Sequence, residues 1–431
     1  MQEPLTKSGS ATACRDASAA VTSRLLFVSG TAANVRQGSG TYVGIAVLRR
    51  ALEARGAVIE SAAPAHTSAG AWRRLWFNFG LRRRARHRAL DGVTAVVGFD
   101  LDGVLLPHRR PRAWLDVASI KGVLAEEMQF ERGWVRGRLA LQAWFERRRV
   151  HQADRVLVTS QYAAEAVIRR YGADPGKLRV VPEPIELAAW QARFNTVAAA
   201  ERPPVEPPLE AAWKRHEQSG RPLPPVEARP QATSGSDPGK SGEPPEPPTT
   251  SASDPAKSSE PLILCVAHLY PRKDVATLLH ALAQMRQPAR AHIVGDGPEF
   301  GRLQQLARQL QLGPGVEFLG HIPLAALRRE YRNADIFCLP SRQEGFGIVL
   351  LEAMAAALPI VAARAAAIPE VVAEGECALL FPPGDAVALA ATLDRLLGDE
   401  PARRHLGQNG QRNVLRYDAA RVAEAFLNAL A

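Results

Sequence analysis

The stretch SRQEGFGIVLLE at residues 341–352 is the most informative about the fold. It follows the apolar run at 336–339, which is typical of a buried strand, and it leads into an apolar helix. Gly345 and Gly347 would let a ligand approach the backbone closely, and the free N–H groups where the helix begins suit a diphosphate. Glu344 precedes this helix and Glu352 lies within it, so both carboxylates can accept hydrogen bonds from hydroxyl groups of one elongated ligand.

Strands and helices alternate on both sides of this stretch, in two blocks of similar size, 24–195 and 261–431. Such alternation with short loops predicts an α/β fold of two Rossmann-like domains, each with a parallel sheet covered by helices on both faces. We expect the two domains to face a cleft, with the ligand at the carboxyl ends of the strands. The expected strands are 24–29, 95–99, 117–120, 155–159 and 178–181 in the first block, and 262–267, 291–294, 316–319, 336–339 and 359–362 in the second.

The segment between the blocks has a different composition. Residues 201–260 hold 14 of the 33 prolines, and Ser, Glu and Gly fill much of the rest. So few large apolar residues cannot offset the entropy lost on ordering the chain. We therefore expect residues 196–260 to form a disordered linker, either a plain spacer or a docking segment for a proline-recognising partner. Residues 1–23 are expected to be a disordered tail that lacks the features of a signal peptide.

Overall composition narrows the class of protein. The chain has 431 residues, of which 46% are hydrophobic, so it can bury real cores. Its 54 basic residues against 44 acidic ones favour anionic partners: nucleic acid, phosphates or an acidic membrane surface. The four cysteines show no C-x-x-C pairing, which argues against a disulfide scaffold or a zinc ribbon and favours a reducing, cytoplasmic setting.

Three more motifs precede the first one in the second block: CVAHLYPRKD at 265–274, IVGDGPE at 293–299 and VEFLG at 316–320. Together with the spacing Glu344-x7-Glu352, this ordered series resembles the motifs of the retaining family 4 glycosyltransferases, which have the two-domain GT-B fold. Taken alone, Glu344 is also explained as an acid at a helix start, Glu352 as an exposed helix residue and Lys273 as a solvated lysine. Only the order of the motifs favours the functional interpretation.

The resemblance implies a role for each donor-side residue. Glu344 would contact hydroxyls of the transferred sugar, Glu352 would bind the ribose, and Lys273 would stabilise the charge that develops on the leaving diphosphate. The family usually has arginine where His268 stands. The implied nucleotide-sugar site comprises His268, Arg272, Lys273, Gly295, Asp296, Gly345, Phe346, Gly347, Ile348 and Glu352, with Gly38 and Gly40 from the first block.

The first block would bind the acceptor, and its resemblance to the family is looser. ADRVLVTS at 153–160 is similar to a family strand, but Glu183-Pro184 replaces the family's Asn-Gly, and Lys121 stands where family members often have a histidine. Asp100, Asp102 and Lys121 are candidates on the acceptor side. The pattern D-x-D-G at 100–103 also resembles magnesium-dependent haloacid-dehalogenase phosphatases, with Asp100 as nucleophile.

Residues 72–88, from Trp72 to Arg88, combine seven arginines with four large aromatic residues and no acid. This composition is typical of a basic aromatic face that rests on anionic lipid. A helix whose aromatic residues pack on the sheet would have the same composition, and a nucleic-acid surface is a further interpretation.

We therefore expect a retaining hexosyltransferase that uses a nucleotide-diphosphate sugar as donor and a glycan or lipid-linked acceptor of the cell envelope. It would need no metal or other cofactor and bind no nucleic acid. It would work in the cytoplasm or at the inner face of the membrane, and the last helix would pack on the first domain. The alternatives are a non-catalytic relative that binds sugar nucleotides and the phosphatase built on Asp100.

Overall fold

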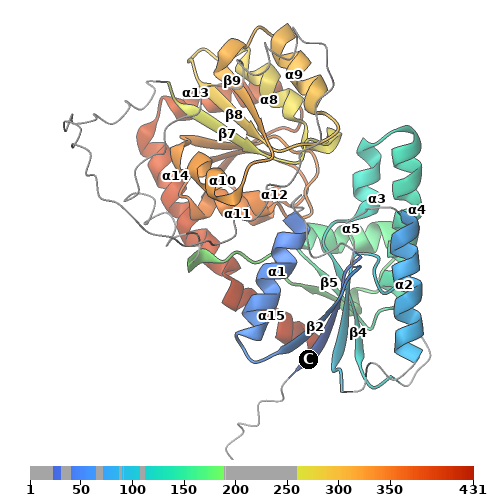
Figure 1. Cartoon of the computed structure of the whole chain (residues 1–431). Coiled ribbons are helices and arrows are strands. Elements are labelled where there is room, and N and C mark those ends of the chain that lie inside the picture. The colour runs from blue at the N-terminus through green and yellow to red at the C-terminus, as the bar shows by residue number, and fades with distance from the viewer. Residues whose placement is uncertain are drawn as a thin grey trace, which may run out of the picture. The chain divides into compact units, whose positions relative to one another are not determined.

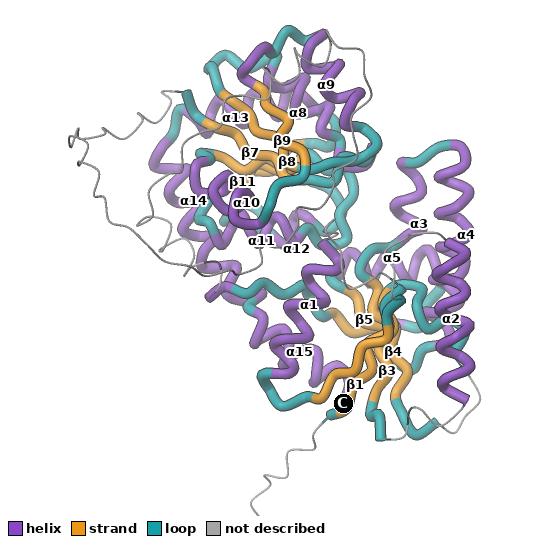
Figure 2. The backbone as a smooth tube through the Cα atoms, in the orientation of Figure 1, coloured by secondary structure: helices purple, strands orange, loops and turns teal. Residues whose placement is uncertain are grey.

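The computed structural model describes residues 23–30, 40–64, 71–86, 90, 92–106, 112–188, 190 and 260–431. Two parallel sheets carry the fold, as the sequence predicts, and each has six strands where the sequence predicts five (Figures 1 and 2). The expected tail and linker lie outside the described residues, apart from their last residues, Ser23 and Glu260. No helix in the described ranges is both long enough and apolar enough to cross a membrane.

The strands are β1 (Arg24–Val28), β2 (Val58–Ala62), β3 (Ala95–Phe99), β4 (Leu115–Ile120), β5 (Arg155–Val158), β6 (Leu178–Val180), β7 (Leu262–Val266), β8 (Arg290–Val294), β9 (Val316–Gly320), β10 (Ile336–Leu339), β11 (Ile360–Ala363) and β12 (Ala378–Phe381). The α-helices are α1 (Gly40–Glu53), α2 (Ala71–Arg86), α3 (Leu124–Glu127), α4 (Gly133–Gln152), α5 (Gln161–Tyr171), α8 (Val275–Leu282), α9 (Phe300–Gln309), α10 (Leu324–Asn333), α11 (Ile348–Ala355), α12 (Ile368–Val371), α13 (Ala386–Leu397), α14 (Glu400–Asn413) and α15 (Ala419–Leu430).

The N-terminal half forms a sheet of order β2-β1-β3-β4-β5-β6. Successive side chains of a strand point to opposite faces, so Leu25 and Phe27 pack with α1 and α15, whereas Leu26 and Val28 pack with α2. Ile120 of β4 lies on the α2 face, where it packs with α4 and α5. One face is thus covered by α1 and α15, and the other by α2, α4 and α5.

The C-terminal half forms a sheet of order β12-β11-β10-β7-β8-β9. Leu264 and Phe337 face the core shared with α10 and α11, whereas Ile263 and Cys338 face α8, α9 and α13. The helices that follow β7 and β10, α8 and α11, therefore cover opposite faces. The loops that leave these two neighbouring strands diverge, and this switch in direction is where open α/β sheets bind ligands.

The last helix, α15, packs on the N-terminal sheet (Figure 1). The chain returns to this sheet through a parallel bridge between Ile185 and Asp418, in which the Ile185 N–H donates to the Tyr417 carbonyl at 2.9 Å. Phe426 of α15 is buried and makes an edge-to-face contact with Phe27, with ring centroids 6.1 Å apart.

Two edge strands, β2 and β12, are absent from the expected set of strands. In β2 only Ile59 is buried among five residues, so its sequence lacks the continuous apolar run that marks a central strand. β12 pairs with β11 alone.

Replacing Phe426 with alanine is expected to lower the free energy of unfolding by about 3–5 kcal/mol, the usual effect of removing a buried aromatic side chain. Denaturant unfolding of the full chain measures this change. Val387→Ala, at an exposed position of α13, serves as the control. An unfolding midpoint for Phe426→Ala equal to that of the control would contradict the role given to α15.

Candidate functional site

The loops that follow β7 and β10 leave the C-terminal sheet where its strand order reverses, and two contacts join them. Lys273 closes the 3-10 helix Pro271–Lys273, and its Nζ lies 2.5 Å from Oε1 of Glu344. Both side chains are largely buried, with 14% and 8% of their surface exposed. A backbone hydrogen bond of 2.8 Å from the Arg342 N–H to the Arg272 carbonyl also joins the loops. Two candidate residues 71 positions apart are thus held in contact.

The second loop ends in the glycines that the sequence indicates. Gly347 precedes α11 with a φ of 92°, a backbone conformation that favours glycine, and no side chain caps the first N–H groups of the helix. Ile348 begins α11, so its backbone faces the start of the helix dipole. The ring of Phe346 instead lies in the core against Tyr417, at 5.3 Å between centroids, which leaves only its backbone for a ligand.

Glu352 lies in α11 and is half-buried. Its Oε2 accepts a hydrogen bond of 2.8 Å from the hydroxyl of Tyr331, which lies in the last turn of α10. Burial raises the pKa of Glu352 to about 7, against the lowering effects of the Tyr331 hydrogen bond and the nearby Arg328. This carboxyl group therefore titrates near neutral pH.

The Gly-Asp-Gly turn after β8 supports the first loop. A Cβ on Gly295 would lie 1.9 Å from the carbonyl oxygen of Ala267, so only glycine allows this contact. The Asp296 carbonyl accepts a hydrogen bond of 2.9 Å from the Leu269 N–H. The Asp296 side chain is exposed, and its carboxylate accepts a hydrogen bond from the Gly297 N–H. His268 is exposed in the first loop, between Ala267 and Leu269, whose backbones contact this turn.

Arg272 makes its polar contact with the N-terminal half. Its guanidinium lies 3.5 Å from Glu127 and 5.0 Å from the ring centroid of Tyr270. Its neighbour in the chain, Lys273, makes the contact with Glu344. The side chains of these two neighbours thus have different partners, and their assignment to one ligand stays a prediction.

The carbonyl oxygen of Gly345 accepts two hydrogen bonds from the N-terminal half. The donors are the hydroxyl groups of Thr159 and Ser160, both at 3.0 Å and both buried. A Cβ on Gly345 would lie 2.7 Å from the Lys121 carbonyl oxygen, so this position too requires glycine. Thr159 and Ser160 are the last two residues of the ADRVLVTS motif. This motif predicts that they lie at the end of a strand, but it does not predict their hydrogen bonds to Gly345.

Lys121 follows β4, and its ammonium group pairs with Glu183 at 2.8 Å. At most 5% of either side chain is exposed. A Cβ on Gly44 of α1 would lie 2.1 Å from the Glu183 carboxylate and 3.4 Å from Cδ1 of Ile348. Glu183 was missed as a site residue. Lys121 and Glu183 both depart from the family pattern, and this shared departure could have indicated that they form a pair.

Asp100 follows β3 at the corresponding switch of the N-terminal sheet, between β1 and β3. Its φ of 56° is unusual for a residue other than glycine, and its Oδ1 accepts from the Lys121 N–H at 3.0 Å. Burial raises the pKa of Asp100 to about 6, although Arg74 opposes this effect. Asp100 and Lys121 are thus brought together by backbone geometry.

Asp102 is fully buried and serves as an anchor for the same loop. Its carboxylate accepts two hydrogen bonds from Arg74, one from Asn78 and one from the Gly30 N–H. These partners occupy both oxygens, which favours a structural role for Asp102 over contact with an acceptor.

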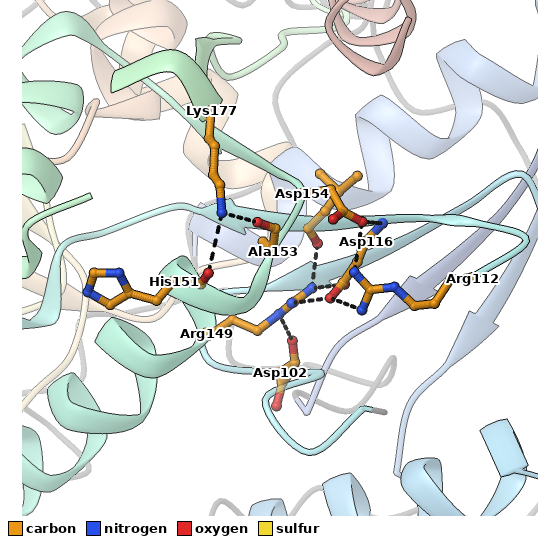
Figure 3. Close-up of polar contacts among 9 residues, drawn as sticks. Asp102, Arg112, Asp116, Arg149, His151, Ala153, Asp154 and Lys177 are labelled. Atoms are coloured by element: carbon orange, nitrogen blue, oxygen red, sulfur yellow. Dashed lines mark hydrogen bonds and ion pairs between the residues drawn. The ribbon is translucent and has the colours of Figure 1, made fainter. Parts of the chain in front are cut away.

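A buried arginine, Arg149, also stabilises this loop (Figure 3). It donates to the Asp102 carbonyl at 3.1 Å and forms a two-point ion pair with Asp116, with bonds of 3.0 and 2.6 Å. Arg112 joins Asp116 to Asp154 at the edge of the network. Buried charges must be paired in this way to be tolerated.

Of the two glycines expected near the donor phosphates, Gly38 lies outside the described residues, and Gly40 is the first residue of α1. Among the residues that the structure describes, no group of three or more His, Cys, Asp or Glu side chains is arranged to hold a metal ion.

Comparison with known proteins gives a match for each half. Residues 39–189 match the model of "Glycosyltransferase Family 4", and residues 248–413 match "Glycosyl transferases group 1". An MMP alpha-(1->4)-mannosyltransferase from Mycolicibacterium hassiacum is 38% identical over 34% of this chain and 36% of that protein. A GDP-mannose-dependent alpha-(1-6)-phosphatidylinositol monomannoside mannosyltransferase from Mycolicibacterium smegmatis is 34% identical over 38% of this chain and 47% of that protein. This chain thus spans less than half the length of either relative.

The fold also occurs in solved structures. Sucrose-phosphate synthase from Thermosynechococcus elongatus matches with a TM-score of 0.70 over 94% of this chain and 98% of that chain, at 21% identity. The likeness extends over both sheets and therefore shows that the architecture is shared.

The raised pKa of Glu352 predicts a pH-dependent stability. The folded state keeps this proton up to about pH 7, whereas an unfolded glutamate releases it near its ordinary value of 4.5. The free energy of unfolding should therefore fall as the pH rises from about 4.5 to about 7, by at most about 3 kcal/mol. Glu352→Gln should match the wild type near pH 5 and exceed its melting temperature near pH 8.

Thermal unfolding of both proteins across this range measures the effect, and Glu400→Gln, at an exposed glutamate, controls for the loss of charge. A difference between Glu352→Gln and the wild type that stays constant with pH would contradict the assignment.

Proposed function

The chain belongs to the family 4 glycosyltransferases of the GT-B fold, and from this we propose that it transfers a sugar from a nucleotide-diphosphate sugar to an acceptor hydroxyl with retention of configuration. The observation that carries the proposal is the contact between Lys273 and Glu344 beside the start of α11. A cation, a carboxylate and unpaired helix N–H groups at one place suit the diphosphate and the sugar of a single donor.

Lys273 acts on the leaving group. As the bond between sugar and diphosphate breaks, negative charge grows on the phosphate oxygens, and a fixed ammonium group stabilises that charge more than it stabilises the bound donor. The ion pair with Glu344 holds the lysine in place before the donor arrives, so little reorganisation is needed. Glu344 then accepts hydrogen bonds from hydroxyls of the sugar.

Glu352 binds the ribose, and the Tyr331 hydroxyl orients its carboxylate. The backbone of Gly347 and Ile348 holds the diphosphate. His268, Gly295 and Asp296 shape the wall of this site, because the turn at 295–297 packs on the loop that carries His268. Arg272 takes part by joining the donor loop to Glu127.

The acceptor is a glycan or lipid-linked hydroxyl compound of the cell envelope. Support comes from the names of the relatives, one of which acts on a phosphatidylinositol mannoside, and from the net charge of +10, which favours an anionic surface. The segment from Trp72 to Arg88 would contribute to such a surface at the inner face of the membrane. Within it, Trp76 is exposed, whereas Arg74 and Asn78 bind Asp102.

A non-catalytic relative that binds sugar nucleotides is the second candidate. It is favoured by one observation: Lys121, which replaces a frequent histidine of the family, has its ammonium group paired with Glu183. Isothermal titration that shows donor binding, with no transfer to any of a wide set of acceptors, would support this alternative.

Lys273→Met and Glu344→Gln are each expected to lower the rate of transfer by about 10²–10³-fold, the usual effect of removing one group that stabilises developing charge. Thermal shift with a panel of nucleotide sugars identifies the donor, because a ligand that binds only the native state raises its melting temperature. Release of nucleoside diphosphate in the presence of acceptor then measures transfer. Removal of divalent metal by EDTA should leave the wild-type rate unchanged.

Glu400→Gln is the matched control, because Glu400 forms an ion pair with Arg404 of α14, outside the two loops. Melting temperatures of all variants establish that they are folded. Transfer by both Lys273→Met and Glu344→Gln at rates close to that of the control would refute the assigned roles.

A further inference from the structure

Helix α4 presents an apolar and strongly basic surface that the donor site does not use. Trp134, Leu141 and Trp144 are 84%, 55% and 55% exposed. Their spacings of seven and three residues place them on one stripe of a helix. The other exposed side chains of α4 include several arginines, among them Arg136, Arg138 and Arg147, and the one acidic residue of the helix, Glu146, is buried.

The opposite side of α4 is firmly attached to the sheet. Ala143 and Val150 lie in the core against β4 and β5. Arg149 forms the buried ion pair with Asp116, and Glu146 accepts hydrogen bonds from the Leu124 N–H and the Tyr171 hydroxyl. The exposed tryptophans are therefore held outward on a rigid element. Single exposed apolar residues are ordinary, but a rigid stripe of large ones marks an interaction surface.

We propose that the exposed face of α4 binds an anionic lipid surface. Tryptophan is suited to the boundary between lipid tails and head groups, because its ring is apolar and its N–H is polar. Arginines beside it attract acidic head groups, and the face carries no exposed acid to oppose them. α2 covers the same side of the sheet and adds Trp76 and Phe79, which are 71% and 52% exposed.

This surface adjoins the donor loops, and here the inference rests on the proposed function. α4 begins three residues after Phe130, and the guanidinium of Arg342 lies 5.7 Å from the centre of that ring. Arg342 belongs to the loop that carries Glu344. Glu127, in the same connection, contacts Arg272. An acceptor anchored in the lipid would thus reach the enzyme close to the diphosphate site.

Flotation of the full chain with vesicles tests the proposal. The wild type should bind vesicles of phosphatidylcholine mixed with phosphatidylglycerol, lose binding as salt rises, and bind pure phosphatidylcholine weakly. The double variants Trp134→Ala/Trp144→Ala and Arg136→Glu/Arg138→Glu should each bind the anionic vesicles at least about tenfold more weakly, because apolar insertion and charge both contribute.

Arg308→Glu/Arg395→Glu is the matched control: it changes the net charge equally, at exposed arginines on α9 and α13 of the other half. Trp76→Ala measures how much α2 contributes to vesicle binding. Equal binding by the α4 variants and this control, or no binding by the wild type at low salt, would overturn the proposal. A change in oligomeric state on sedimentation, without a change in vesicle binding, would instead assign the face to a second copy.

Transfer to a water-soluble acceptor separates this inference from the proposed function. The α4 variants should retain wild-type rates with such an acceptor and lose rate only when the acceptor is embedded in anionic vesicles. A wild type that binds vesicles through α4 but transfers no sugar would refute the proposed function alone. If every α4 variant transferred sugar to the vesicle-embedded acceptor at the wild-type rate, the role of α4 would be refuted and the proposed function would stand.

Discussion

The site depends on the switch point of the C-terminal sheet, where the strand order reverses between β7 and β10 and the loops of these two strands leave toward opposite faces. α8 and α11 cover opposite faces of the C-terminal sheet, so the loops after β7 and β10 separate above the strand ends. The contact between Lys273 and Glu344 spans this separation, and the backbone bond between Arg342 and Arg272 fixes its distance. Gly295 lets the loop after β8 pack against the loop after β7, so the position of the loop that carries Lys273 also depends on this turn.

The two departures from the family pattern in the N-terminal half explain one another. A lysine buried alone would be strongly unfavourable, and the same holds for a glutamate. Lys121 and Glu183 meet at 2.8 Å and neutralise each other, while Gly44 leaves room for the carboxylate. The pair lies beside Gly345 and Ile348. This chain therefore has a buried ion pair at the place where the family pattern has other residues.

Much of the fold follows from local sequence, because buried parallel strands form continuous apolar runs and glycines mark the loops. The central strands were predicted on this basis, whereas the meaning of the donor motifs came from the resemblance of their ordered series to the family. The network around Arg149 was not, since it joins residues 33 to 47 positions apart whose pairing no local pattern indicates. For residues 72–88 the sequence left a lipid surface, packing on the sheet and a nucleic-acid surface open, and it did not predict that Arg74 and Asn78 bind Asp102. The exposed stripe on α4 was missed because arginines obscure its period.

The acids at the two switches, Asp100 and Glu352, share one electrostatic property. Burial raises the pKa of each toward neutrality, to about 6 and about 7. A group held in this state lowers stability relative to an apolar side chain, and such groups concentrate where chemistry or binding needs them. Hydroxyl groups of a ligand donate hydrogen bonds to the charged form and so lower these pKa values. Binding of a polyhydroxylated ligand near neutral pH should therefore be coupled to release of protons from the site.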